Sequence, residues 1–274
     1  MCAMTRRGLI KAGIGLACGG FFPWTAVAGP DSYYLRNRSR LLHEFAGLCL
    51  GMEQYLAAQA GPDGPQGRAL DRALARAKAA TDLARQTFAN LLPGLPEVGG
   101  ETNRNLVNVI QAGWLGAAYT GMKAQGFTAR QAGRMFYDLC EADLKAKPRA
   151  ELLTQGRDYF SKASRQYLEQ WAEWTQLRLY PGDWVAVAVF GDGRDFVLGH
   201  DYSQCGALKY FQALNMPEIA PYFCLNDFTL SRYQDTGLAR TMTLAEGHPV
   251  CDFRYKPGRP VTQGFGSETP KFPV

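Results

Sequence analysis

The chain is predicted to be an α+β protein, in which a helical region comes first and a small antiparallel sheet with packed helices follows. Two observations predict this order. Before Pro181, apolar residues recur at the three- and four-residue spacing of amphipathic helices. After Pro181, apolar residues alternate as they do in strands, and glycine-containing turns separate the runs. The 274 residues suit one large domain or two small ones.

The helical region is expected to span residues 29–180. Segments with glycine and proline, such as Gly61-Pro62 and Pro93-Gly94, interrupt the apolar pattern and are typical of helix ends. Asp31 and Thr128 stand where a helix N-cap is expected. The predicted helices cover residues 32–60, 68–92, 102–125, 129–147 and 149–179.

The α+β region is expected to span residues 181–259. A first hairpin is predicted from strands 183–190 and 195–202, because Gly191-Asp192-Gly193 is a typical turn. A helix over 204–214 follows. Strands 238–245 and 250–256 are predicted to form a second hairpin, and residues 260–274 a surface arm.

The first 28 residues are typical of an export signal. Arg6-Arg7 precedes a short apolar run, which is the twin-arginine pattern, and Ala26-Val27-Ala28 is a cleavage motif. We therefore expect a periplasmic or otherwise exported protein, with the export machinery as its partner in transit. The alternatives are a disordered basic tail, an uncleaved anchor and a lipid anchor at Cys18.

Charge and hydropathy exclude two classes of partner. Without the three basic residues of the signal, 27 basic residues stand against 25 acidic ones. This balance does not fit a nucleic-acid binding surface. No apolar run after the signal is long enough to cross a bilayer, so no stable membrane span is expected.

Five cysteines remain after the signal. An odd number leaves at least one free thiol in an oxidising compartment. Cys49 and Cys140 lie in apolar helical sequence and are expected to be buried small hydrophobes. Cys205, Cys224 and Cys251 lie instead in the α+β region, where they accompany charged residues.

Thiols, arginines and carboxylates are concentrated between residues 205 and 259. Long polar side chains are rarely buried without a partner, so this density indicates a site. The residues concerned are Cys205, Cys224, Asp227, Arg240, Glu246, His248, Cys251, Asp252 and Arg254.

Motifs in the same segment resemble the L-2-amino-thiazoline-4-carboxylic acid hydrolase family. The closing strand also resembles, as a fold only, the small ligand-binding domains of the 4-vinyl reductase type. The family motifs are Cys205-Gly206-Ala207-Leu208-Lys209-Tyr210-Phe211, Pro221-Tyr222-Phe223-Cys224-Leu225-Asn226-Asp227, and Arg240-Thr241-Met242-Thr243-Leu244-Ala245-Glu246-Gly247 with Cys251-Asp252-Phe253-Arg254.

The family resemblance implies a hydrolase that acts on a small molecule. The implied reaction cleaves a carbon–nitrogen bond in a cyclic amidine, a five-membered ring that carries an exocyclic amino group and a carboxylate. The opened product is an N-carbamoyl cysteine, which connects the reaction to cysteine metabolism. No cofactor is expected.

Such a reaction needs a nucleophile, a proton donor and a charge partner for the carboxylate. We expect Cys224 to act as nucleophile with Asp227 as base, and His248 to move a proton near neutral pH. His200 is a second candidate for that proton transfer. Alternatively, Cys224 is a packed or disulfide-bonded residue, Asp227 caps a helix, and His248 is an exposed turn residue.

Arginine can hold a carboxylate with two parallel hydrogen bonds. We expect Arg240 and Arg254 to bind the substrate in this way, with Thr241 and Thr243 beside them. The arginines could instead pair with Glu246 or Asp252 within the protein.

The roles of the remaining motif residues are left open. Cys205, Cys251 and Asp252 support the family resemblance more firmly than any role in catalysis. A zinc or iron site formed by Cys205, Cys224, His248 and Cys251 is an alternative, but their spacing fits no common zinc pattern, and no metal is expected.

A second functional hypothesis is a non-catalytic ligand-binding or accessory protein of the same fold. The twin-arginine route carries folded proteins, which fits export with a bound ligand or partner. The enzyme hypothesis expects a pocket where Cys224, Asp227 and one arginine converge. The binding hypothesis expects an apolar cavity whose thiols are paired or inert.

Overall fold

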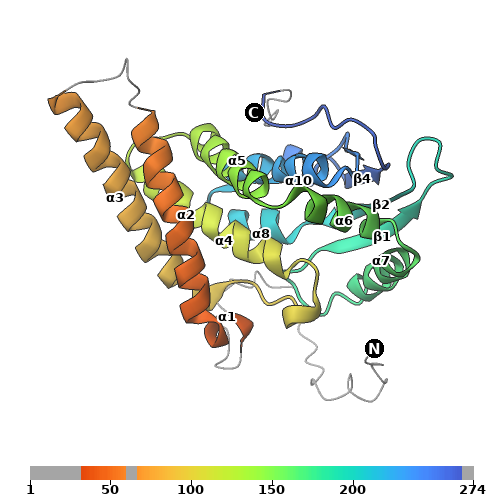
Figure 1. Ribbon diagram of the computed structural model, residues 1–274. Helices are drawn as coiled ribbons and strands as arrows, with labels where there is room; N and C mark the ends of the chain where they lie inside the picture. Colours follow the sequence, from red (N-terminus) through yellow and green to blue (C-terminus); the bar gives the residue numbers. More distant parts are fainter. Residues whose placement is uncertain (1–31, 60–66, 267–274) are drawn as a thin grey trace.

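The computed structural model describes residues 32–59 and 67–266, and it confirms the predicted α+β class (Figure 1). The expected export signal, the Asp31 cap and residues 267–274 of the expected arm lie outside the described residues. The first helix, α1 (Tyr33–Arg36), is capped by Ser32, whose hydroxyl accepts a hydrogen bond from the Leu35 backbone N–H.

Three long helices form one side of the molecule. Helices α2 (Arg38–Ala58) and α3 (Arg68–Leu91) lie side by side, and α4 (Leu106–Ala124) packs against α3 (Figure 1). A Cβ at Gly121 would lie 2.0 Å from the Ala80 carbonyl oxygen, so glycine is what lets α3 and α4 approach this closely. The short 3₁₀ turns η2 (Leu92–Gly94) and η3 (Gly100–Thr102) connect these two helices.

The fourth predicted helix begins where the sequence indicates. Helix α5 (Ala129–Ala146) starts with a capping box, in which Thr128 and Gln131 each bond the other's backbone N–H.

The predicted helix over 149–179 is wrong in one respect, because the chain forms two helices there. Helix α6 (Arg149–Tyr159) is followed by its C-cap residue, Phe160. Ser161 then caps a new helix, α7 (Lys162–Thr175), because its hydroxyl accepts a hydrogen bond from Ser164 N at 3.1 Å. Tertiary packing explains the break: α6 packs against α10, whereas α7 packs against the first strand.

The sheet has four antiparallel strands in the order β1-β2-β4-β3. Strands β1 (Val185–Phe190) and β2 (Leu198–Gln204) form the predicted first hairpin. Strand β4 (Cys251–Tyr255) pairs with β2, and the short β3 (Leu238–Ala239) pairs with β4.

The predicted strand over 238–245 is wrong beyond Ala239. The chain leaves the sheet there and forms a loop with the 3₁₀ turn η5 (Leu244–Glu246). The Asp252 carboxylate accepts hydrogen bonds from Thr241 N at 2.8 Å, Met242 N at 2.6 Å and Thr241 Oγ1 at 2.6 Å. These bonds replace the ladder partners that a longer strand would have needed.

The remaining helices lie between β2 and β3 in the chain. They are α8 (Gly206–Ala213), the 3₁₀ turn η4 (Pro217–Ile219), α9 (Ala220–Cys224) and α10 (Asn226–Gln234). One cluster of buried side chains, including Phe88, Phe211 and Phe253, extends through the helical and α+β regions alike. Among the described residues, no helix is both long and apolar enough to cross a membrane.

The described part of the expected arm returns to the body of the protein. Gln263 exchanges hydrogen bonds with the backbone of Arg240, at 3.2 and 2.7 Å. The Phe265 ring stacks on Tyr222, with ring centroids 5.8 Å apart.

Candidate functional site

The strand period of two places one set of side chains on a single face of the sheet. His200 and Tyr202 of β2, and Cys251, Phe253 and Tyr255 of β4, line a cavity of about 260 Å³. The register pairs His200 with Phe253 and Tyr202 with Cys251, so these side chains are neighbours across the two strands. This space is called the first cavity below.

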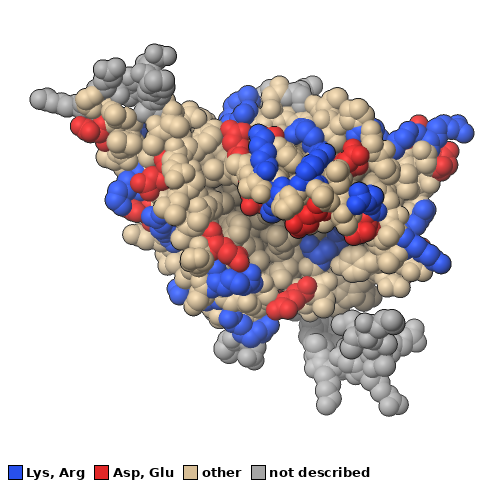
Figure 2. Space-filling view, viewed as in Figure 1, with Lys and Arg blue, Asp and Glu red and all other residues tan. Residues whose placement is uncertain are grey.

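The opposite wall of the first cavity comes from helices. The segment at the start of α4, the end of α6, the α9–α10 junction and the N-cap of α8 contribute to it. Figure 2 shows the surface hollowed near the middle of the face seen in Figure 1, over α4 and α10. The residues in question are Arg104, Asn105, Asn108, Tyr159, Cys205, Cys224, Asn226 and Asp227.

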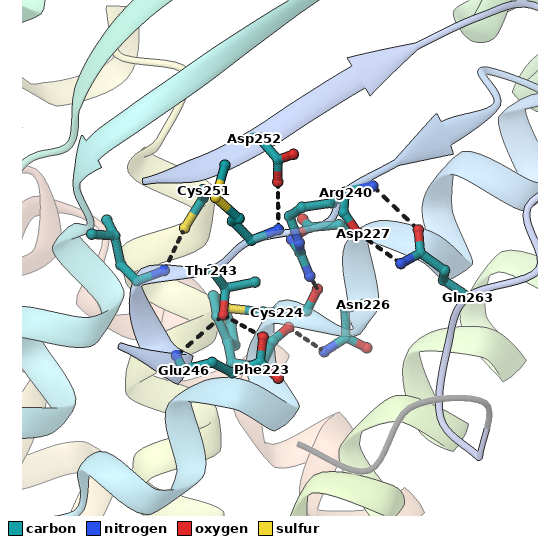
Figure 3. Close-up of polar contacts among 12 residues, drawn as sticks. Phe223, Cys224, Asn226, Asp227, Arg240, Thr243, Glu246, Cys251, Asp252 and Gln263 are labelled. Carbon is teal, nitrogen blue, oxygen red and sulfur yellow. Dashed lines mark hydrogen bonds and ion pairs between the residues drawn. The ribbon is translucent and has the colours of Figure 1, made fainter. Parts of the chain in front are cut away.

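Arg240, which is buried, and the partly exposed Asp227 form an ion pair in this wall (Figure 3). Arg240 Nη1 lies 2.7 Å from Asp227 Oδ2, and Arg240 Nη2 donates to the Cys224 carbonyl at 3.0 Å. The guanidinium also lies 4.8 Å from the Phe228 ring centroid and 4.9 Å from that of Phe253. Only 3% of the Arg240 side chain is exposed, so this arginine is already fully engaged by the protein.

The side chain of Asp227 lines the first cavity. Its side chain retains 43% exposure, which fits a group open to the cavity rather than packed on all sides. Burial raises the pKa of Asp227 above its ordinary value, and the charge and hydrogen bond of Arg240 offset part of that rise. A carboxylate with a raised pKa is a stronger base than an ordinary aspartate.

Three free thiols, those of Cys205, Cys224 and Cys251, line the same cavity. Burial raises the pKa of Cys205 and of Cys251 to about 12, and it also raises the pKa of Cys224. The Cys205 sulfur accepts from Leu208 N and the Cys251 sulfur from Leu244 N. All three are therefore thiols, not thiolates, at neutral pH. Among the described residues, no group of three or more His, Cys, Asp or Glu side chains is arranged to hold a metal ion.

Arg104 is the cation that sequence reasoning missed. It lines the first cavity, and within the described chain no carboxylate lies at ion-pair distance from it. Its guanidinium lies 4.8 Å from the Trp171 ring centroid. Burial acts to lower the pKa of Arg104, but the phenols of Tyr159 and Tyr202 outweigh it and the net shift is upward. Arg104 therefore keeps its charge in the cavity.

The backbone on both sides of Arg104 is fixed by a buried polar network. The Asn103 side-chain amide donates to the Val98 carbonyl at 2.7 Å and to Asp183 Oδ2 at 2.5 Å. The Asn103 oxygen accepts from Asn105 N at 2.8 Å. This network holds the start of α4 in place, so Arg104 is positioned before any ligand binds.

Two residues that line the first cavity also carry a fully buried polar atom that has no hydrogen-bond partner among the described residues. These atoms expose less than 1 Å² each, so they lie behind the cavity surface and are not themselves contact points for a ligand. His200 is neutral, because burial lowers its pKa well below the ordinary value. The two atoms are His200 Nδ1 and Asn226 Oδ1.

Five of the predicted site residues do not line the first cavity, namely Asp252 and the four described next. His248 is exposed, and Thr241 is bound to Asp252. Arg254 is paired with Asp201, at 2.6 Å between Nη1 and Oδ1, and alternation places both on the sheet face opposite Phe253. Thr243 is buried, and its hydroxyl donates to Glu246 Oε2 at 2.8 Å.

The structure does bring together the pocket that the enzyme hypothesis expects. Cys224, Asp227 and Arg240 converge on the first cavity, and Cys205 and Cys251 join them. The sequence indicated this group because its thiols and charged residues are all concentrated in one short segment. Arg104 lies about a hundred residues earlier, and the only signal for it was the polar run from Thr102 to Asn105 before an apolar helix.

A cavity between a small sheet and helices, with a carboxylate, cations and thiols in its walls, is typical of small-molecule enzymes. The family model for L-2-amino-thiazoline-4-carboxylic acid hydrolase matches residues 107–255, which is more than half of the chain. The chain belongs to this family, and a hydrolase-like function is supported at that level. No curated protein and no solved structure matches the chain.

Proposed function

We propose that the protein hydrolyses a cyclic amidine in a small substrate that carries a carboxylate. The observation that carries this proposal is Arg104, a half-buried cation in the same cavity as Asp227 that has no acidic partner among the described residues. A substrate carboxylate on Arg104 would complete the ion pair that the protein leaves open. Membership of the hydrolase family supports the reaction class.

Asp227 is positioned to activate water in this reaction. Its Oδ2 is bound to Arg240, and its carboxylate faces the cavity. Asp227 takes a proton from water as the oxygen adds to the amidine carbon. The adduct then collapses, the bond to the leaving atom breaks, and the proton held by Asp227 passes to that atom. Arg240 keeps the carboxylate in place throughout.

Atom balance distinguishes two outcomes for an aminothiazoline. Its amidine carbon is bonded to two nitrogens and to the ring sulfur. Loss of a nitrogen cleaves a carbon–nitrogen bond, as the family resemblance implies. A product that is an N-carbamoyl cysteine keeps both nitrogens, so it requires the ring carbon–sulfur bond to break and a thiol to form. Carbon–nitrogen cleavage and this product, which the resemblance led us to expect together, therefore exclude each other.

The direct test is an assay of the purified protein with 2-amino-thiazoline-4-carboxylate. Thiol release, ammonia release and product mass are measured separately, with and without a metal chelator. We expect turnover that the chelator leaves unchanged. Binding without any turnover, in saturating substrate, would contradict the proposal.

The second candidate is a ligand-binding protein without activity. The raised thiol pKa values favour it, because inert thiols are what that hypothesis expects. The Asp227 carboxylate and Arg104, which has no carboxylate partner among the described residues, make the first cavity too polar for a simple apolar pocket. Export by the twin-arginine route, with cleavage after Ala28, is part of either proposal.

A further inference from the structure

A second cavity of about 600 Å³ lies beside the first, between α2, α4, α5 and α10. Its walls and those of the first cavity have residues in common, so the two cavities are adjacent. Asp227 is among them and faces both spaces. The shared residues are Asn108, Gln111, Asn226, Asp227 and Leu230.

The walls of the second cavity are mostly apolar. The charged side chains there are partnered or exposed: Lys147 pairs with Asp143 at 2.7 Å, and Glu44 pairs with Arg40. The buried Nε1 of Trp114 has no hydrogen-bond partner. That nitrogen exposes less than 1 Å² and is not open to the cavity, so this space fits an apolar group and not a second anion. The apolar wall comprises Leu48, Trp114, Phe136, Leu139 and Leu144.

The size of the two cavities also favours a substrate larger than a bare ring. Pockets for drug-sized ligands measure about 300–1,000 Å³. The first cavity, at about 260 Å³, lies just below this range. With the second cavity added, the space lies well within it.

Helix α2 contributes a glycine, Gly47, to the wall of the second cavity. A Cβ at Gly47 would meet no atom within 4 Å. Glycine inside a helix costs about 1 kcal/mol relative to alanine, so its presence at this position is not explained by helix stability. Gly47 is exposed and lies in the wall of the second cavity, so a long side chain at position 47 has room to cover the opening of that cavity.

We propose that the second cavity is a subsite for an apolar substituent of the substrate, aromatic or branched alkyl. The carboxylated ring of the same molecule would lie in the first cavity, and this assignment of the ring rests on the proposed function. Asp227, in the wall between the two spaces, then lies next to the bond that joins ring and substituent.

The test compares two ligands, 2-amino-thiazoline-4-carboxylate and its analogue with a benzyl group on the exocyclic nitrogen. Binding is measured by calorimetry with wild type and with Gly47→Ala, Gly47→Leu and Gly47→Phe. We expect the benzyl analogue to bind wild type about tenfold more tightly, because its ring is buried. This preference should shrink stepwise along the series and be lost in Gly47→Phe.

The control is Gln54→Leu, which adds an apolar side chain to the exposed face of α2 outside both cavities. It should keep the full preference for the benzyl analogue. Equal affinity of wild type for both ligands, or an unchanged preference in Gly47→Phe, would overturn the subsite. A benzyl preference that Gly47→Phe removes, without turnover of either ligand, would support the subsite and count against the hydrolase.

Discussion

The two arginines of the first cavity differ in what they contact. Arg240 is held by Asp227, the Cys224 carbonyl and two aromatic rings, so its charge is used inside the protein. Arg104 has a fixed backbone and no carboxylate partner among the described residues. A ligand carboxylate therefore gains most from Arg104, whereas removal of Arg240 would leave Asp227 without its counter-charge.

The proposed role of Asp227 as general base implies that turnover depends on pH. A general base must be deprotonated, so activity falls as the pH falls through its pKa, which burial raises above the ordinary carboxyl value. We expect the acid limb of kcat/KM to lie above the ordinary aspartate pKa of about 3.9. Asp227→Asn should lower kcat at least ~100-fold and remove that limb. An unchanged limb in Asp227→Asn would assign the titration to another group.

A substitution at Cys224 distinguishes direct attack by water from covalent catalysis through the thiol. Its raised pKa makes the thiolate costly, so we expect Cys224→Ser to keep measurable turnover and the wild-type melting temperature. Steady-state kinetics and mass spectrometry of the protein during turnover check this. Complete loss of activity in folded Cys224→Ser, with a covalent adduct on the wild type, would show that the thiol is the nucleophile.

The residues of the site differ in how well sequence reasoning could find them. Cys224, Asp227 and Arg240 were found because the local density of thiols and charges signalled a site. The same reasoning could not separate Arg240, which is paired, from Arg104, which is not. That difference depends on contacts between distant segments, such as the link from Asn103 to Asp183.

Among the elements, the loop between β3 and β4 depends most on one side chain. The Asp252 carboxylate holds Thr241 and Met242 and is 8% exposed. Asp252→Ala should lower the free energy of unfolding by roughly 2–4 kcal/mol, since hydrogen bonds to a buried charge are lost together. Asp252→Asn, which keeps an acceptor, should lose less. Chemical denaturation measures both, and a loss below about 1 kcal/mol in Asp252→Ala would contradict this role.

Local sequence patterns were sufficient to predict some of the secondary-structure elements and not others. The sequence predicted the α+β class, the first hairpin and the start of α5, because periodicity and caps are local signals. It did not predict the break at Ser161 or the end of β3 at Ala239. Both result from tertiary contacts, the first from helix packing and the second from Asp252.

For the whole molecule, we predict export to the cell envelope. The N-terminal motifs predict cleavage after Ala28, and the described body is joined by one buried core. Mass spectrometry of protein from the cell envelope should find an N-terminus at Gly29. An N-terminus at lipid-modified Cys18 would indicate an anchored form, and an intact chain confined to the cytoplasm would rule out export.

The central proposal, that the first cavity holds a carboxylated substrate on Arg104, is tested most directly by the affinity of Arg104→Met. Calorimetry compares 2-amino-thiazoline-4-carboxylate with 2-amino-thiazoline, which lacks the carboxylate, and Arg72→Met on the exposed surface of α3 is the control. A charged hydrogen bond contributes about 1.5–3 kcal/mol, so Arg104→Met should bind the carboxylated ligand at least about tenfold more weakly. Its affinity for the decarboxylated ligand should equal that of wild type. Equal losses for both ligands, or no loss for either, would contradict the account.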